Sequence, residues 1–260
     1  MISNKNLIDV LFVPLFALFV VYPLAALLGR LSLEGMTVTF ADLFFWQSLK
    51  NTLIAALAAS LMSLLLALGF GYYHLFGRNT LVYRIANLMN DLPIAIPHTV
   101  AGLALLLAFG RNSFGFVGRT GLAFTLVAVV LAMFFVSYPL AARTIASGVD
   151  QIDPEMVAVA RTLGDIPYKA YLRVVIPALG EALFSGFVLS YARSLSEFAA
   201  VAMFGGNVPG STQVLASYVF SKVEEGELGM AITASAVCIA ISAILVTILS
   251  LVNHRRLKNA

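Results

Sequence analysis

The chain has 260 residues, of which 60% are apolar and only 11% are Asp, Glu, Lys or Arg. Soluble domains carry about 25% charged residues, so this chain has too few charges to cover a soluble core of its size. A net charge of +3 without runs of Lys or Arg argues against nucleic-acid binding, and a single cysteine excludes an intrachain disulfide. The composition therefore predicts an all-α membrane protein, for which the lipid bilayer is the solvent.

Six segments are long enough to cross a bilayer, which takes about 20 apolar residues in a helix. The fifth segment along the chain contains Glu181, Arg193 and Glu197, whereas each of the other segments contains a long run without any acidic or basic residue. The first segment is too long for the apolar part of a signal peptide, so we expect it to be retained. The predicted helices are 8–29, 51–76, 91–110, 120–142, 176–202 and 229–252, within one transmembrane domain over residues 1–260.

The distribution of basic residues predicts the orientation in the membrane. If the N-terminus is cytoplasmic, the inner segments hold ten of the 16 Lys and Arg residues, the outer segments hold five, and Arg193 lies within a helix. Because basic residues are in excess on the cytoplasmic side, both termini and the loop over residues 150–173 are predicted to be cytoplasmic.

The loop over residues 150–173 carries the signals of a short helix with defined ends. Asp153 is a good N-cap residue, Pro154 suits the first helical turn, and Glu155 suits the positive end of the helix. Gly164 follows at a position where helices often end in a left-handed turn. We therefore expect a helix, a glycine turn and a second helix.

The sequence Ala-Arg-Thr-Leu-Gly, followed by nine residues and then Val-Val-Ile-Pro, resembles the signature loop of permease subunits in binding-protein-dependent ABC importers. That signature reads Glu-Ala-Ala, three residues, Gly, nine residues, Ile-x-Leu-Pro. Gly164 and Pro177 keep their places, but Ala158 stands where the signature has Glu. The residues to which the resemblance gives a role in coupling to an ATPase are Asp153, Glu155, Ala158, Ala160, Arg161, Thr162, Leu163, Gly164, Tyr168 and Pro177.

Two further stretches extend this resemblance, which covers the chain from about residue 50 to its C-terminus. Residues 91–102 and residues 192–199, with Gly206 and Asn207 after them, are similar to molybdate, tungstate and sulfate permeases. Within the second stretch, Ser196 and Ala199 take places that are often filled by Gly.

Pro93 and Pro97 interrupt an apolar segment, and each of them removes a backbone donor and kinks or breaks a helix. Transporters use broken helices along substrate paths, but a kink that serves only packing is an equally good interpretation. His98 and Thr99 follow the second proline and place hydrogen-bond donors beside this candidate path.

Arg193 and Glu197 are charged residues inside a predicted span, where charges are costly and usually face the interior of a bundle. At a spacing of i, i+4 they share one helix face and are able to pair. A structural ion pair is the favoured interpretation, and contact with a substrate remains the alternative.

The resemblance implies the architecture of a type I ABC importer permease in the cytoplasmic membrane of a prokaryote. Two copies of the chain would line a path for an oxyanion, with molybdate or tungstate ahead of sulfate. Two cytoplasmic ATP-binding subunits would hold ATP and Mg, and an extracytoplasmic binding protein would deliver the anion. The chain itself has no Gly-Lys dipeptide, hence no P-loop, and we expect no enzyme activity, cofactor or metal in it.

Two other classes remain open at this stage. An ion-coupled secondary transporter would use Glu197 and His98 to bind the coupling ion. An intramembrane enzyme is the third class, although the sequence contains neither His-Glu-x-x-His nor Gly-x-Ser-x-Gly.

Overall fold

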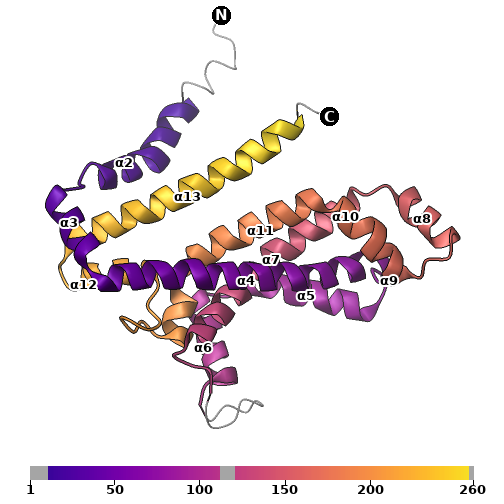
Figure 1. The fold of residues 1–260 in the computed structure, drawn as a ribbon, viewed down its shortest axis with the longest axis horizontal. Coiled ribbons are helices and arrows are strands. Elements are labelled where there is room, and N and C mark those ends of the chain that lie inside the picture. Colours follow the sequence, from indigo (N-terminus) through magenta and orange to yellow (C-terminus); the bar gives the residue numbers. More distant parts are fainter. Residues whose placement is uncertain (1–10, 112–120, 258–260) are drawn as a thin grey trace, which may run out of the picture.

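The computed structural model describes residues 11–111 and 121–257, with side chains up to residue 250, and all regular secondary structure in these ranges is helical (Figure 1). Four helices are long and apolar enough to span a membrane, and two bent helix pairs raise the number to six if each pair is one span. The four are Leu11–Leu28, Leu43–Phe76, Leu126–Asp150 and Leu228–Ser250, and the pairs are Leu81–Ala95 with His98–Phe109 and Pro167–Ala178 with Gly180–Leu195.

The first span includes the π-helix η1 (Ala17–Val21) and α2 (Tyr22–Leu28). The elements that follow are α3 (Leu33–Ala41), α4 (Leu43–Phe76), α5 (Leu81–Ala95), α6 (His98–Phe109), α7 (Leu126–Asp150), α8 (Pro154–Thr162), α9 (Pro167–Ala170), η2 (Tyr171–Val175), α10 (Ile176–Ala178), α11 (Gly180–Leu195), η3 (Val201–Gly205), α12 (Leu215–Glu224) and α13 (Leu228–Leu257).

The third predicted span is broken rather than straight. The segment expected as one helix over 91–110 consists of α5 and α6, which meet at an angle of 118°. Pro97 precedes α6 and has no backbone N–H, and Ile96 before it is extended with ψ 145°, as residues before proline commonly are. Pro93 remains inside α5 and is buried there.

The fifth predicted span, expected over 176–202, is also bent. Residues 167–178 and α11 meet at 74°, with Leu179 at the junction. Helix α11 ends at Leu195, because Glu197 then turns its carboxylate to the backbone N–H of Ala200 at 2.8 Å and caps a new helical turn. The continuous helix that the sequence predicted to residue 202 is therefore wrong.

Three other helix ends differ from the sequence prediction. Helix α4 begins at Leu43 instead of residue 51, because the Asp42 carboxylate accepts the Phe44 N–H at 2.9 Å and caps it. Helix α7 covers 126–150 instead of 120–142, since Thr125 caps its start and its later charged side chains are half-exposed and paired. Helix α3 occupies a segment expected to be a loop.

Small residues allow α4 to pack closely along α7 and α11. Ala55, Ala56 and Ala59 of α4 are fully buried against a cluster that includes Ala128 and Ala132 of α7. Small side chains let helix backbones approach in a membrane, where there is no water to drive helices together. This contact forms the centre of the molecule.

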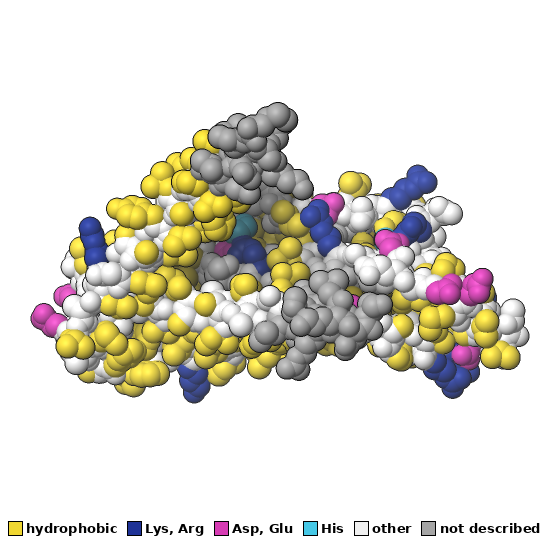
Figure 2. Space-filling view, turned by 90° about the horizontal axis from the view of Figure 1, so that it is seen from above, with side chains coloured by type: hydrophobic (Ala, Val, Ile, Leu, Met, Phe, Trp, Pro, Cys, Tyr) yellow, Lys and Arg dark blue, Asp and Glu magenta, His cyan; other side chains and the backbone are white. Residues whose placement is uncertain are grey.

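The two ends of the bundle carry different elements. Helices α3 and α12 lie at one end, and α8 lies at the other, while α2 and α13 splay away from α4 (Figure 1). At the first end, the buried Tyr218 donates its hydroxyl to Asp42 at 2.7 Å, and burial together with this carboxylate raises the pKa of Tyr218. The surface is mostly hydrophobic, and many of its charged side chains gather towards the α8 end (Figure 2).

Gly71→Ala is expected to lower the thermal stability of the purified protein, whereas Gly69→Ala is expected to raise it slightly. A Cβ atom at position 71 would lie 2.7 Å from both Ile145 Cγ2 and the Tyr171 hydroxyl, but one at position 69 would meet nothing within 4 Å. Both changes gain the same helix propensity, so overpacking of about 1–3 kcal/mol separates them. Thermal unfolding in detergent measures the difference, and equal midpoints would contradict the close packing around position 71.

Candidate functional site

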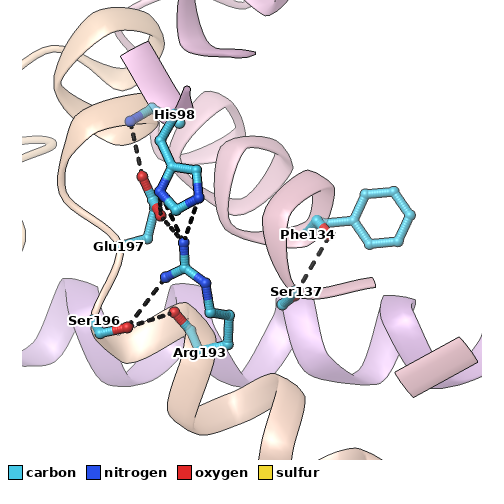
Figure 3. A network of polar contacts seen from close by, with 7 residues as sticks. His98, Phe134, Ser137, Arg193, Ser196 and Glu197 are labelled. Atoms are coloured by element: carbon cyan, nitrogen blue, oxygen red, sulfur yellow. Dashed lines mark hydrogen bonds and ion pairs between the residues drawn. The ribbon is translucent and has the colours of Figure 1, made fainter. Parts of the chain in front are cut away.

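A polar network joins the break in the third span to the turn after α11 (Figure 3). Its centre is Glu197, whose side chain is only 1% exposed. One carboxylate oxygen, Oε2, accepts from Arg193 Nη2 at 2.7 Å and lies 3.1 Å from His98 Nδ1. The other, Oε1, accepts the backbone N–H of Ala200 at 2.8 Å. Both oxygens of the buried carboxylate therefore have partners from two separate parts of the chain.

Arg193 and His98 are less buried than the carboxylate that holds them, with side chains 22% and 37% exposed. Arg193 Nη1 also donates to Ser196 Oγ at 3.1 Å, and Nη2 lies 3.0 Å from His98 Nε2. Arg193 Nη2 is also 2.8 Å from His98 Nδ1, so this one guanidinium nitrogen contacts both ring nitrogens as well as the carboxylate. The opposite charges of Arg193 and Glu197 compensate each other, so this ion pair adds no net charge to the network.

Figure 2 shows histidine, basic and acidic side chains together on the floor of a hollow between hydrophobic walls. The predicted pairing of Arg193 with Glu197 at i, i+4 is confirmed, and His98 joins them from 95 residues before Arg193 in the chain. Pro97 brings His98 there by redirecting the chain into α6. Thr99 is exposed and is not part of this network.

The loop of residues 150–173, called the α8 loop from here on, has the predicted caps. The Asp153 carboxylate accepts the Glu155 N–H at 2.9 Å. At the other end of α8, Gly164 has a φ of +95°, its N–H bonds to the Arg161 carbonyl at 3.2 Å, and the Asp165 N–H bonds to the Ala160 carbonyl at 3.1 Å. These two bonds form a Schellman motif, which gives this short helix a well-defined end.

Helix α8 presents large apolar side chains to the outside of the chain. Leu163 is 83% exposed and Val159 57%, with Met156 and Tyr168 also exposed, whereas Val157 and Ala160 are buried. Ala158, in the place where the signature has Glu, is exposed as well. Exposed apolar side chains on a polar, charged loop are typical of a protein-binding surface.

The remaining residues of the predicted coupling set have local roles. Arg161 Nη1 donates to the Asp165 carbonyl at 3.1 Å, and the Thr162 hydroxyl donates to the Val159 carbonyl at 2.8 Å. Glu155 lies exposed in the first turn of α8, and Pro177 lies exposed just before the 74° bend. Pro177 is thus separated from α8 and belongs to the membrane end of the loop.

The sequence prediction missed a polar cavity of about 440 Å³ between α7 and α11, on the side of the α8 loop. Thr144 and Ser147 of α7 line it with Gln151, which follows the end of α7, and with Arg143, which pairs with Asp91 of α5 at 2.7 Å. The spacing of these polar residues at i, i+3 and i+7 along one helix face is the signal that predicts it.

These features define a class of protein: a helical, multi-pass membrane protein with broken spans around a buried ion pair, as in transporters. Residues 63–259 match the family described as the inner membrane component of binding-protein-dependent transport systems. The chain belongs to this family, the permease subunits of binding-protein-dependent ABC importers.

Similar sequences include the sulfate transport system permease protein CysT of Salmonella typhimurium, which is 32% identical over 88% of this chain and 84% of its own length. The Bacillus subtilis protein YvgM, whose name assigns it to molybdenum transport, is 34% identical over 58% of this chain and 68% of its own.

The expected fold is confirmed by a solved structure. A bacterial ABC transporter that imports the acidic polysaccharide alginate contains a chain that matches with a TM-score of 0.75. The match covers 98% of this chain and 97% of that one at 14% identity, so it supports the fold alone.

Glu197→Gln is expected to lower the free energy of unfolding by about 3 kcal/mol, because Arg193 loses its buried counter-charge. Adding Arg193→Met removes the stranded charge, so the double variant is expected to recover part of this loss. The control, Glu225→Gln, breaks a half-exposed pair with Lys222 and should change stability by less than about 0.5 kcal/mol. Thermal unfolding measures all three, and a double variant less stable than the single one would argue against charge compensation.

Proposed function

We propose that this chain is the membrane-spanning subunit of an ATP-driven importer and that it forms the path for an oxyanion. Two copies of the chain line the path, two ATP-binding subunits bind the α8 loops, and an extracytoplasmic protein delivers the anion. ATP and its Mg²⁺ are held by the partner subunits. Both termini and the α8 loop are on the cytoplasmic side of a prokaryotic membrane, in accord with the excess of basic residues on these segments.

The observation that carries this proposal is the surface of α8. A helix of nine residues with firm caps at Asp153 and Gly164 is rigid enough to act as a lever. Its exposed Val159 and Leu163 provide apolar anchors for a partner. Apolar side chains that face water outside the membrane are costly unless another protein covers them. The missing Glu at Ala158 removes one charged contact but leaves these anchors in place.

The path itself is proposed to run past Arg193 and His98. The guanidinium of Arg193, whose side chain is partly exposed, can bind an oxyanion for a moment, while Glu197 holds Arg193 and His98 in place and limits the positive charge. A path for transport needs weak binding, since an anion held tightly would not leave. The polar cavity between α7 and α11 extends this path towards the α8 loop.

The relatives named for sulfate and for molybdenum support a tetrahedral oxyanion as the substrate class. The resemblance over residues 91–102 keeps molybdate or tungstate ahead of sulfate in this proposal. Selectivity would reside in the binding protein. Calorimetric titration of that protein with sulfate, molybdate, tungstate and phosphate decides among them, and binding of a cationic or neutral solute instead would refute the anion assignment.

An ion-coupled secondary transporter receives less support. Glu197 would be its coupling residue, but both carboxylate oxygens accept hydrogen bonds and the side chain is 1% exposed. Transport by the purified chain alone, driven by an ion gradient, would restore this alternative.

Val159→Asp is expected to reduce retention of the ATP-binding subunits on the affinity-purified chain by about tenfold or more, because it places a charge in an apolar anchor. Val223→Asp is the matched control, since Val223 is 51% exposed compared with 57% for Val159 but lies on α12 at the opposite end. Equal retention by both variants would contradict the docking role of α8.

A further inference from the structure

The two ends of the α8 loop are both attached to the same end of α4. At the start of the loop, Asp150 is the last residue of α7, and its Oδ1 accepts from His74 Nε2 at 3.0 Å and from Arg78 Nη2. His74 is buried in α4, and its other ring nitrogen, Nδ1, is 2.8 Å from the hydroxyl of Tyr83 on α5. Asp150 is thus held by His74, in the last turn of α4, and by Arg78, just beyond the end of that helix.

At the other end of the loop, the first residue of η2 makes the second attachment. The Tyr171 hydroxyl donates to the Leu68 backbone carbonyl of α4 at 2.7 Å, and its ring is buried against Tyr72. Gly71 permits this approach, because a Cβ atom there would lie 2.7 Å from the Tyr171 hydroxyl. We call the contacts of Asp150 and Tyr171 with α4 the α4 clamp.

The α4 clamp is compact. Its contacts on α4 run from Leu68 to His74, which are about 9 Å apart at 1.5 Å per residue of helix. The loop residues that they hold are 150 and 171. Because one rigid helical segment holds both ends, the loop and the end of α4 are constrained to move together.

The chain is interrupted where the loop joins the spans on either side of it. Residues 151–153 between α7 and α8 are not helical, and the chain bends by 74° at Leu179 between the loop and α11. Helix α4, by contrast, is continuous over 34 residues and reaches α12 at the opposite end of the bundle. A push on α8 therefore reaches α4 directly through the Tyr171 contact, and it reaches α4 also through the end of α7, which Asp150 ties to His74.

We propose that α4 is the element that carries the movement of the docked ATPase across the membrane, and that Asp150 and Tyr171 are the positioning residues that connect it to α8. This inference rests on the proposed function, since it takes the α8 loop to be where an ATPase binds. The Arg78 and Asp150 side chains are 53% and 52% exposed, so their pairing adds little stability and its role is to fix position.

The test uses the assembled importer in proteoliposomes, with Asp150→Asn and Tyr171→Phe as separate variants. Tyr171→Phe removes the hydrogen bond to Leu68, and Asp150→Asn removes the negative charge that attracts His74 and Arg78, and both variants keep the size of the side chain. Tyr72→Phe is the control for the tyrosine, because its hydroxyl makes no hydrogen bond among the described residues. Glu225→Gln is the control for the carboxylate, since Glu225 is 53% exposed and also paired with a basic residue.

Three quantities are measured for every variant: retention of the ATP-binding subunits, anion transported per ATP hydrolysed, and the distance between spin labels on α4 and the loop. The labels are placed by Leu65→Cys and Lys169→Cys, both at exposed positions, in a Cys238→Ser background. Each clamp variant is expected to retain the ATP-binding subunits, to transport about fivefold less anion per ATP, and to show a broadened label distance. The two controls are expected to match the unmodified protein.

Unchanged transport per ATP in both clamp variants, with the ATP-binding subunits still bound, would overturn this inference and leave the proposed function intact. A failure of the unmodified chain to retain ATP-binding subunits would overturn both. Lower transport with an unchanged, narrow label distance would also refute the inference, because the loop would then still follow α4.

Discussion

A polar group inside a bilayer has no water to bind, so the protein must supply its partner. The centre of this molecule follows from that constraint. The break at Pro97 and the end of α11 at Leu195 expose backbone groups, and the chain places them where His98 and Glu197 meet. The carboxylate of Glu197 then satisfies a backbone N–H, a guanidinium and an imidazole together. The irregular backbone and the buried charge therefore compensate each other, and this arrangement joins α6 to the turn after α11.

The same constraint determines how force can cross the membrane. Helices that pack through small residues, as α4 does with α7, cannot slide without opening voids, so they move as units. Helix α4 also has polar attachments near both ends. Asp42, its N-cap, is tied to Tyr218 of α12, and the α4 clamp is at the other end. In the mechanism proposed above, the short, capped α8 passes the movement of the ATPase to a helix that extends along the whole bundle.

Local features of the sequence were predicted well, since they depend on neighbours in the chain. The caps at Asp153 and Gly164 and the pairing of Arg193 with Glu197 are set by spacings of a few residues, and the structure has all of them. The prolines indicated a kink or break in the third span, which the structure has at Pro97, but neither its angle of 118° nor the 74° bend in the fifth span was predicted, because composition does not determine the angle between two helices. Helix α3 was missed because a short helix outside the spans gives no long apolar signal.

The sequence by itself determined that the lipid bilayer is the solvent of this chain and how many apolar segments are long enough to cross it. It also determined the capped loop with its glycine turn. These depend on composition and on contacts within one or two helical turns. Only the tertiary structure decided that His98 joins Arg193 and Glu197, because Arg193 is 95 residues further along the chain than His98. It alone decided that Asp150 and Tyr171 converge on α4, because such contacts depend on how helices cross and bend.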